Sequence, residues 1–198
     1  MQENYCSIKE FKARLTERSH AYERDAQTNS ITLSAREINL LAESISKELN
    51  LWIDFSDVIS FGTPAPSGVE NDVYFDNITN SMIKVNNLML SKDVLSFLKR
   101  IEYHNYFFPQ TEYHLVGFTG FGNGSIYPVL KQDYIPNATY ATHGEILDYM
   151  EALGATFVED ATFKIGNILI SDLRPRNVLK SIDSHDIFVI DVDFKELP

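Results

Sequence analysis

The stretch "SDLRPRNVL", residues 171–179, places one acid, two arginines, a proline and an asparagine between apolar neighbours. The apolar run "IGNILI" precedes it, and a second run, "IFVIDVD", follows it. Taken alone, the spacing of Asp172 and Asn177 favours an Asx-type turn that joins two strands, because such acid-to-amide pairs occur in many turns. The alternative is a loop that holds a metal ion and a phosphate, with Asp191 in the second run as a further oxygen ligand.

The composition indicates a folded chain. Hydrophobic residues make up 44% of the 198 residues and aromatic residues 12%, which is enough for a sizeable core. The net charge of −11 offers nucleic acid no long-range attraction, so we expect no nucleic-acid partner. We also expect no signal peptide and no membrane association, because no run approaches the roughly 18 apolar residues of a membrane span. Cys6 is the only cysteine, which excludes an internal disulfide and fits the reducing cytoplasm.

Two capped helices are predicted in residues 1–50, which form an N-terminal helical extension. "SIKE" opens the first helix, with Ser7 as N-cap and Glu10 completing a capping box. "SAREINLLAESISKELN" repeats the pattern with Ser34 and Glu37. "DAQTNSIT", which lies between the two helices, is the predicted turn.

From Leu51 the hydrophobic period changes. "LWIDFSDVISFG" has the bulky residues of a strand, and "TPAPSG" has the composition of a loop. "NDVYFD" and "SMIKVNNL" predict a hairpin across "NIT", and "EYHLVGFTGF" and "SIYPVLKQDYI" predict a second hairpin across "GNG".

Two further helices interrupt these strands. "SKDVLSFLKRIEYHN" predicts one helix, and "THGEILDYMEALGA" predicts another that is boxed by Thr142 and Glu145 and closed by Gly154. The last forty or so residues predict strands and turns. Runs of neighbouring strands interrupted by single helices predict an α+β fold with antiparallel sheets.

"DLRPRNVL" followed by "VID" resembles the catalytic loop and the metal-binding Asp of the protein-kinase superfamily. The resemblance implies that Asp172 accepts the proton of the attacking hydroxyl, and that Asn177 and Asp191 hold Mg²⁺ against the phosphates of ATP. Arg174 stands where the family often has a basic residue that steadies the transferred phosphoryl group. These residue types suit the chemistry, because hard cations prefer oxygen ligands.

The same resemblance implies a phosphate-covering loop and a lysine earlier in the chain. "PSGVENDV" aligns with G-x-G-x-x-G-x-V, with Gly68 as the central glycine and Val73 as the final valine, whereas Pro66 and Asn71 replace the outer glycines. Lys84 in "MIKV" corresponds to the lysine that contacts the nucleotide phosphates. The alternative is an ordinary strand lysine that faces water, opposite its apolar neighbours.

Further nucleotide-binding residues are implied after this lysine. Glu102 is the only Glu of the helix "SKDVLSFLKRIEYHN" and is the candidate partner of Lys84, near the predicted end of the helix. "VLKQDYIP" resembles the hinge, where Gln132, Tyr134 and their neighbours would present backbone groups to adenine. His104 in "HNYFFP" is interpreted as a structural hydrogen-bonding residue.

The ordered series "W-I…SGVENDVY…IKVNN…HNYFFP…GF…QDYI…SDLRPRNVL…VID" resembles the small bacterial kinase-like domains found within polyvalent proteins of mobile elements. The resemblance runs from about Trp52 to Asp193. It implies a kinase-like domain over residues 51–198, with an antiparallel β-rich N-lobe up to about residue 135 and a minimal C-lobe from about residue 136. ATP and Mg²⁺ would bind between these lobes.

The sequence also departs from the superfamily. Ile170 and Ser171 stand where His and Arg of H-R-D are usual, and D-F-G becomes Asp191, Val192 and Asp193. Only "VDFKELP" follows Asp191, so we expect no activation segment and no large helical lobe, and the phosphate acceptor is an unknown protein or small molecule. Two alternatives to a minimal phosphotransferase stay open. One is a catalytically inactive, pseudokinase-like interaction module, and the other is a hydrolase that uses the same acidic metal site.

Overall fold

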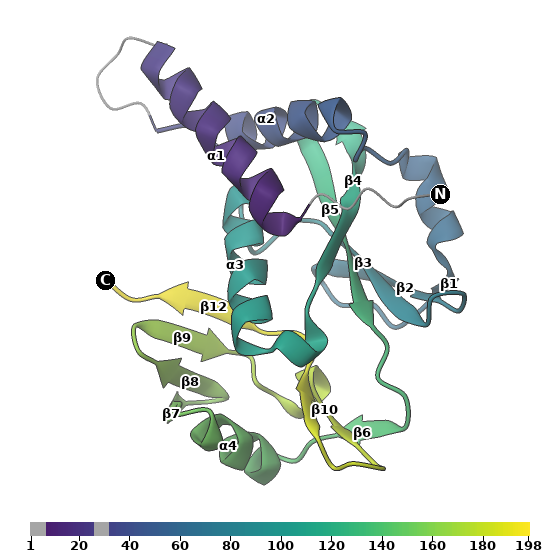
Figure 1. Cartoon of the computed structure of the whole chain (residues 1–198), viewed down its shortest axis with the longest axis vertical. Helices are drawn as coiled ribbons and strands as arrows, with labels where there is room; N and C mark the ends of the chain where they lie inside the picture. The colour runs from purple at the N-terminus through teal and green to yellow at the C-terminus, as the bar shows by residue number, and fades with distance from the viewer. Residues whose placement is uncertain (1–6, 26–31) are drawn as a thin grey trace. The chain divides into compact units, whose positions relative to one another are not determined.

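The computed structural model describes residues 7–25 and 32–198 of the chain (Figure 1). The predicted turn "DAQTNSIT" lies largely outside these residues. The chain divides into two compact units. The first unit runs to Glu102 and resumes from Tyr113 to Asp133, and the second comprises Tyr103–Glu112 and Tyr134–Pro198.

Two capped helices begin the first unit, as predicted. They are α1 (Ile8–Asp25) and α2 (Ala35–Glu48). The capping boxes predicted at Ser7 and Ser34 are both present, because each of these residues exchanges hydrogen bonds with the Glu three positions later. The boxes satisfy backbone N–H groups that a helix start otherwise leaves without partners.

Five antiparallel strands form the sheet of the first unit, in the order β1-β2-β3-β5-β4 (Figure 1). They are β1 (Thr63–Pro64), β2 (Asn71–Asp76), β3 (Ser81–Asn86), β4 (His114–Gly122) and β5 (Ser125–Asp133). Both predicted hairpins are confirmed, since β2 pairs with β3 and β4 pairs with β5. The hairpins join through β3 and β5, so Lys84 lies on an interior strand, opposite Val73 on one side and Leu130 on the other.

The strand predicted at "LWIDFSDVISFG" is wrong for its second half. Phe55–Phe61 form a 3-10 helix, η1, and Ile59 within it is 81% exposed. Local hydrogen bonds replace a strand ladder here, because the Asp57 N–H donates to the Asp54 carbonyl and the Ser60 hydroxyl donates to the Asp57 carbonyl. Asp and Ser favour such turns over extended structure.

The first half of this segment does follow a strand, but for only a few residues. Trp52 forms an isolated parallel bridge with Phe118 of β4, through Ile53 N–H to Phe118 O and Phe118 N–H to Leu51 O. Gly117 permits the approach, because a Cβ there would lie 2.4 Å from the Leu51 carbonyl oxygen.

Helices cover one face of the sheet with the main apolar core of this unit. α3 (Val94–Phe107) follows β3 as predicted, and α2 lies against β4 and β5 (Figure 1). Phe11 of α1 is fully buried, and its ring centroid lies 4.4 Å from that of Phe118. Other fully or nearly fully buried members are Leu15, Ala42, Ile45, Val94, Phe97, Leu98 and Ile126.

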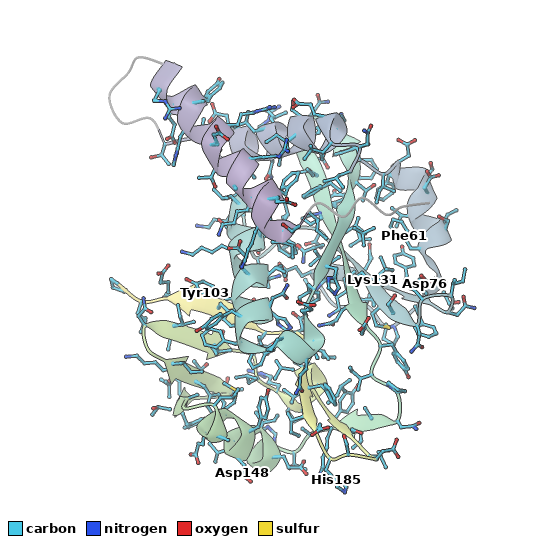
Figure 2. The ribbon with its side chains drawn as sticks, in the orientation of Figure 1. Phe61, Asp76, Tyr103, Lys131, Asp148 and His185 are labelled. Atoms are coloured by element: carbon cyan, nitrogen blue, oxygen red, sulfur yellow. The ribbon has the colours of Figure 1, made fainter. Side chains whose placement is uncertain are left out.

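A smaller cluster lies on the opposite face of the sheet, which η1 covers. Phe61, which is labelled in Figure 2, packs edge-on against Tyr74 of β2, and their ring centroids lie 6.2 Å apart. The buried residues of this smaller cluster are Val58, Ile83, Val85 and Val129. Ile83 and Val85 thus point away from the face that Lys84 occupies, as period-2 alternation requires.

The second unit contains α4 (His143–Ala152) and two small antiparallel sheets, together with the end of α3. Helix α4 has the predicted capping box of Thr142 and Glu145, and it ends before Gly154, whose φ is +81°. The sheets have the orders β11-β10-β6 and β12-β9-β8-β7. Their strands are β6 (Ala138–Tyr140), β7 (Thr156–Glu159), β8 (Thr162–Ile165), β9 (Ile168–Ser171), β10 (Val178–Ser181), β11 (Ile187–Val189) and β12 (Asp193–Glu196).

The strand pairs within the named sheets are antiparallel, which confirms the α+β class. α4 and both sheets of the second unit share one apolar core, which includes Ile146, Met150, Phe163, Ile170, Leu173, Val178, Val189 and Val192. Across the two described stretches, every helix is too short or too polar to span a membrane.

His104 has the structural role predicted for it. Its ring is 1% exposed, and its Nε2 lies 3.0 Å from the carbonyl oxygen of Thr111 in the 3-10 helix η2 (Pro109–Thr111). The Thr111 hydroxyl in turn donates to the carbonyl of Val189. This chain of contacts ties the turn after α3 to β11.

The N-terminal cap of α4 predicts a pH-dependent stability. The Lys180 ammonium of β10, together with the Thr142 backbone N–H and hydroxyl, holds the pKa of Glu145 at about 2, below its usual 4.5. A lowered carboxyl pKa stabilises the fold above the unfolded value, and this contribution disappears as the pH falls through the folded value. Glu145→Gln should therefore lower Tm near neutral pH, and the difference from the wild type should shrink between pH 4.5 and 2.

Glu151→Gln provides the control, because it makes the same change at an exposed position of the same helix. Its Tm difference should be small and should lack this pH dependence. A Glu145→Gln difference that is equally large at both ends of the pH range would contradict the assignment.

Candidate functional site

Backbone pairing in the second unit brings two chain segments together. β9 leads into residues 172–177 and then β10, while β11 leads into residues 190–192 and then β12. β10 pairs with β11, and β9 pairs with β12 in a register that sets Ser171 opposite Asp193. Each of the two segments therefore connects the sheet that contains β9 and β12 to the sheet that contains β10 and β11. The Ile190 N–H donates to the Asn177 carbonyl at 2.9 Å, so they lie side by side.

Core burial directs the polar side chains of these segments outward. Leu173, Val178 and Val192 are at most 5% exposed, and each is the chain neighbour of a predicted site residue. Asp172, Asn177 and Asp191, which each precede one of these buried residues, are only half-buried. Asp172 accordingly remains partly exposed, with 33% of its side chain accessible.

The loop after β9 has a special backbone at Asp172. The φ of Asp172 is +61°, in the left-handed region that Asp tolerates better than most residues. The Arg174 N–H then donates to the Asp172 carbonyl at 2.8 Å, and Pro175–Asn177 form the 3-10 helix η3. A turn that joins two strands is therefore present, as expected from the sequence alone, although the bond that closes it is between backbone groups and not of the expected Asx type. This turn is the frame of the candidate site.

Donor groups from the same loop surround the Asp172 carboxylate. Arg176 Nη2 donates to both carboxylate oxygens at 3.0 Å, and Arg174 Nε lies 3.1 Å from Oδ1. Asn177 Nδ2 donates to Oδ2 at 2.7 Å and to the Asp172 carbonyl at 2.9 Å. The structure thus brings together three of the predicted residues, Asp172, Arg174 and Asn177.

Two contacts of this loop were not predicted from the sequence. Arg174 Nη2 donates to Asp160 at 2.8 Å, and the Leu173 N–H donates to the carbonyl of Ala161 at 3.1 Å. Asp160 and Ala161 form the turn between β7 and β8, and both have positive φ. The dipeptide Asp-Ala carries no turn signature as strong as Asn-Gly, so these two contacts could not be predicted from the local sequence.

The residue types fit a Mg²⁺ ion. Asn177 donates its amide N–H to Asp172, which leaves its carbonyl-type Oδ1 as the atom of the right chemistry for a cation. Asp191 directly follows Ile190, which is bonded to Asn177. Within the described ranges, no group of three or more His, Cys, Asp or Glu side chains could hold a metal. Mg²⁺ bound with a nucleotide usually takes one or two protein oxygens beside phosphates and waters, and the residue types of Asn177 and Asp191 are compatible with that number.

Lys84, in the first unit, is not a solvent-facing strand lysine. It is 9% exposed, its Nζ donates to the Tyr113 hydroxyl at 2.8 Å, and the same Nζ lies 4.8 Å from the centroid of the Tyr113 ring. A buried ammonium needs such partners, because desolvation of an unpaired charge is costly. Tyr113 was not predicted as a site residue, and its place 29 residues beyond Lys84 carries no motif.

In the loop before β2, Gly68 faces open space, and neighbouring residues of the loop are held by hydrogen bonds and an ion pair. Gly68 is exposed, and a Cβ added there would meet nothing within 4 Å. The Val73 N–H donates to the Ser67 hydroxyl at 3.1 Å. Glu70 forms an ion pair with Arg100 of α3 at 2.8 Å, and both side chains are about one-tenth exposed. This buried pair, absent from the sequence-based prediction, fixes the loop to the helix.

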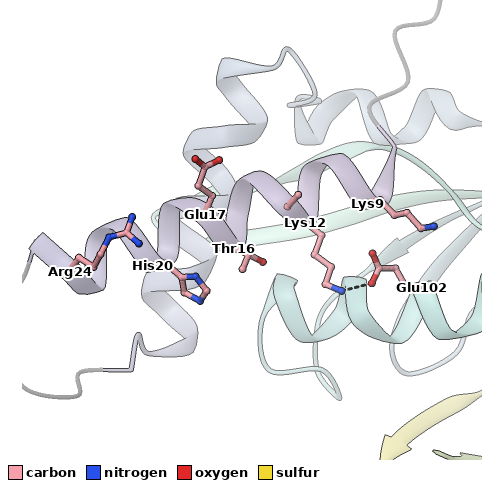
Figure 3. Close-up of a pocket in the computed structure, with 8 residues that line it drawn as sticks. Lys9, Lys12, Thr16, Glu17, His20, Arg24 and Glu102 are labelled. Atoms are coloured by element: carbon pink, nitrogen blue, oxygen red, sulfur yellow. Dashed lines mark hydrogen bonds and ion pairs between the residues drawn. The ribbon is translucent and has the colours of Figure 1, made fainter.

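Glu102 contacts a different lysine from the one predicted. Lys12 of α1 forms an ion pair with Glu102 (Figure 3). The pair borders a groove of about 550 Å³ that α1 lines with Lys9, Thr16, Glu17, His20 and Arg24. The structure therefore brings Glu102 to Lys12 and brings Lys84 to Tyr113.

The predicted hinge residues lie at the end of β5. Gln132 is 2% exposed and pairs with Met82 of β3, whereas Tyr134 is 42% exposed. The division between the two units falls between Asp133 and Tyr134, inside the predicted hinge.

Comparison with known proteins identifies the family. A model of the family described as serine/threonine/tyrosine kinase found in polyvalent proteins matches residues 35–197. The chain belongs to this kinase family. The match spans Lys84, the Asp172 loop and Asp191, and it begins at the first residue of α2, so α1 precedes it. Searches of curated proteins and of solved structures return no match. Membership in this kinase family supports a kinase-like phosphotransferase with a nucleotide substrate.

The backbone of the kinase loop yields a stability prediction. Asp172→Ala and Asp172→Gly remove the same carboxylate, but only glycine adopts a φ of +61° without strain. The glycine variant should therefore be more stable to urea by about 1 kcal/mol. At Lys164, on β8 and without positive φ, the same pair should rank in the opposite order. An alanine variant at position 172 that equals or exceeds the glycine variant would contradict the strained backbone.

Proposed function

We propose that this chain binds ATP with Mg²⁺ and transfers the γ-phosphoryl group to a hydroxyl acceptor. The observation that carries the proposal is the cluster of Asp172, Arg174 and Asn177 held beside Asp191 on one backbone frame. The proposal refines the kinase-like activity that the family implies. A hydrolase would leave the buried Lys84 without a role.

Asp172 is the proposed base. As the acceptor oxygen forms its bond to the γ-phosphorus, the bond from phosphorus to the β–γ bridging oxygen breaks, and ADP leaves with the electron pair. The acceptor hydroxyl proton passes to the Asp172 carboxylate. Arg174, which contacts this carboxylate and Asp160, places a fixed positive charge next to the transferred group.

Asn177 and Asp191 are the proposed metal ligands. When bound, Mg²⁺ neutralises charge on the phosphates. The contribution of the chain is to hold the Asn177 amide through its bonds to Asp172, so that its orientation is set before a ligand arrives.

The first unit supplies the proposed nucleotide contacts. Lys84 would give its charge to the phosphates, with Tyr113 limiting its rotation through a hydrogen bond and the ring face. The open loop at Gly68, with Val73 behind it, would cover the phosphates. The backbone near Gln132 and Tyr134 would meet adenine. The role of Glu102 as a partner of Lys84 stays a proposal, and would require it to leave Lys12.

Nucleotide binding tests the proposal directly. ATP with Mg²⁺ at about 100 times its Kd should stabilise the chain by about 2.7 kcal/mol, which raises Tm by several degrees in a domain of this size. Asp191→Ala and Lys84→Met should each reduce this shift strongly. Asp148→Ala, which removes an exposed acid from α4, should keep it. No shift with any nucleotide at millimolar concentration would refute the proposal and would favour an inactive interaction module.

Phosphotransfer itself tests Asp172. Asp172→Asn should keep the ATP-induced Tm shift and lose about 10²- to 10⁴-fold in transfer rate, because an amide cannot accept the hydroxyl proton. Radiolabel transfer from γ-labelled ATP to acceptor peptides measures the rate, with Asp148→Asn as the matched control. Full activity in Asp172→Asn would show that another group is the base.

A further inference from the structure

Arg176 is the residue of the catalytic loop for which the proposed mechanism has no role. It lies on η3, four residues after Asp172, and its side chain is 64% exposed. Its Nη2 donates to both oxygens of the Asp172 carboxylate at 3.0 Å. An exposed cation thus contacts the proposed base.

The Asp172 carboxylate has no acceptor capacity to spare in this arrangement. It takes four contacts, two from Arg176, one from Arg174 and one from Asn177. A carboxylate offers about four lone-pair sites. An acceptor hydroxyl that donates its proton to Asp172 must therefore displace one of these donors.

Among the three donors, Arg176 is the one free to leave. Asn177 is held by a second bond, to the Asp172 carbonyl, and Arg174 is held by Asp160. For Arg176, Asp172 is the ionic partner that the described part of the chain provides. An exposed pair of this kind is weak, so exchange costs little when the arginine finds another anion.

We propose that Arg176 recognises a carboxylate next to the phosphorylated hydroxyl, so that the preferred acceptor is an acidic peptide with Ser, Thr or Tyr. The proposal rests on the proposed function. Binding of the acceptor carboxylate moves Arg176 from Asp172 to the acceptor, and the vacated Asp172 oxygen receives the hydroxyl. The acceptor in this proposal is a peptide, because the family comprises serine, threonine and tyrosine kinases.

Charge balance distinguishes acceptors. With an acidic acceptor, Arg176 exchanges one carboxylate for another and no charge is left alone. With a neutral acceptor, the Arg176 guanidinium exchanges the Asp172 carboxylate for water. With a basic acceptor, a second cation lies beside the guanidinium. This local preference operates although the whole chain carries −11, because exposed charges farther away than about 8–10 Å are screened at physiological salt.

Three degenerate peptide pools test the proposal with the full chain, ATP and Mg²⁺. Each pool offers Ser, Thr and Tyr, and the pools differ only in flanking residues, which are Glu, Gln or Lys. For the wild type, kcat/KM should fall in the order Glu, Gln, Lys, with about a two- to fivefold preference for Glu over Gln. Arg176→Glu should favour the Lys pool, and Arg176→Gln should make the pools nearly equal. Lys164→Glu makes the same charge change at an exposed position of β8 and should keep the wild-type order.

Each outcome decides the matter. If Arg176→Glu keeps the wild-type order of kcat/KM for the three pools, or if the wild type shows no preference among the pools, the proposal is overturned while the phosphotransferase assignment stays intact. If Arg176→Glu is inactive, Arg176→Gln decides, and loss of transfer to every pool in that variant with ATP binding retained would make Arg176 part of the chemistry instead. Absence of transfer by the wild type to all three pools, with the ATP-induced Tm shift retained, would overturn this proposal alone, whereas loss of the Tm shift as well would overturn the proposed function.

Discussion

The backbone pairing of β9 with β12 and of β10 with β11 is the constraint on which the polar cluster of the second unit depends. This pairing brings residues 172–177 and residues 190–192 side by side, although thirteen or more positions separate them in the sequence. One hydrogen bond between Ile190 and Asn177 fixes their spacing. The buried neighbours Leu173, Val178 and Val192 then anchor both segments in the apolar core of this unit. Side-chain geometry at Asp172 is therefore a consequence of sheet register and core packing rather than of the loop alone.

Local signals made much of the fold predictable. Capping boxes, the hairpins across "NIT" and "GNG", and the glycine stop after α4 all depend on residues a few positions apart, so the sequence specifies them directly. The failure at Phe55–Phe61 has the same origin. Bulky residues there suggested a strand, but hydrogen bonds made by Asp57 and Ser60 within the segment favoured a 3-10 turn.

The candidate site was predictable in its residue types and much less in its contacts. The resemblance to the protein-kinase superfamily, and not the spacing alone, selected Asp172, Asn177 and Asp191 as candidates, because a metal-phosphate site restricts the chemistry of its residues. The partners of these residues depend on packing between distant segments. Nothing local links Arg174 to Asp160 or Lys84 to Tyr113, and the pairing of Glu102 with Lys12 involves residues ninety positions apart.

Helix α1 stands apart from the rest of the chain in one respect, since the family match begins only at residue 35. Yet Phe11 is fully buried against Phe118, inside the same core as α2 and α3. A protein truncated to begin at residue 35 would expose this core to water where Phe11 and Leu15 pack in the full chain. The segment that matches the family is therefore shorter than the segment that completes the core of the first unit.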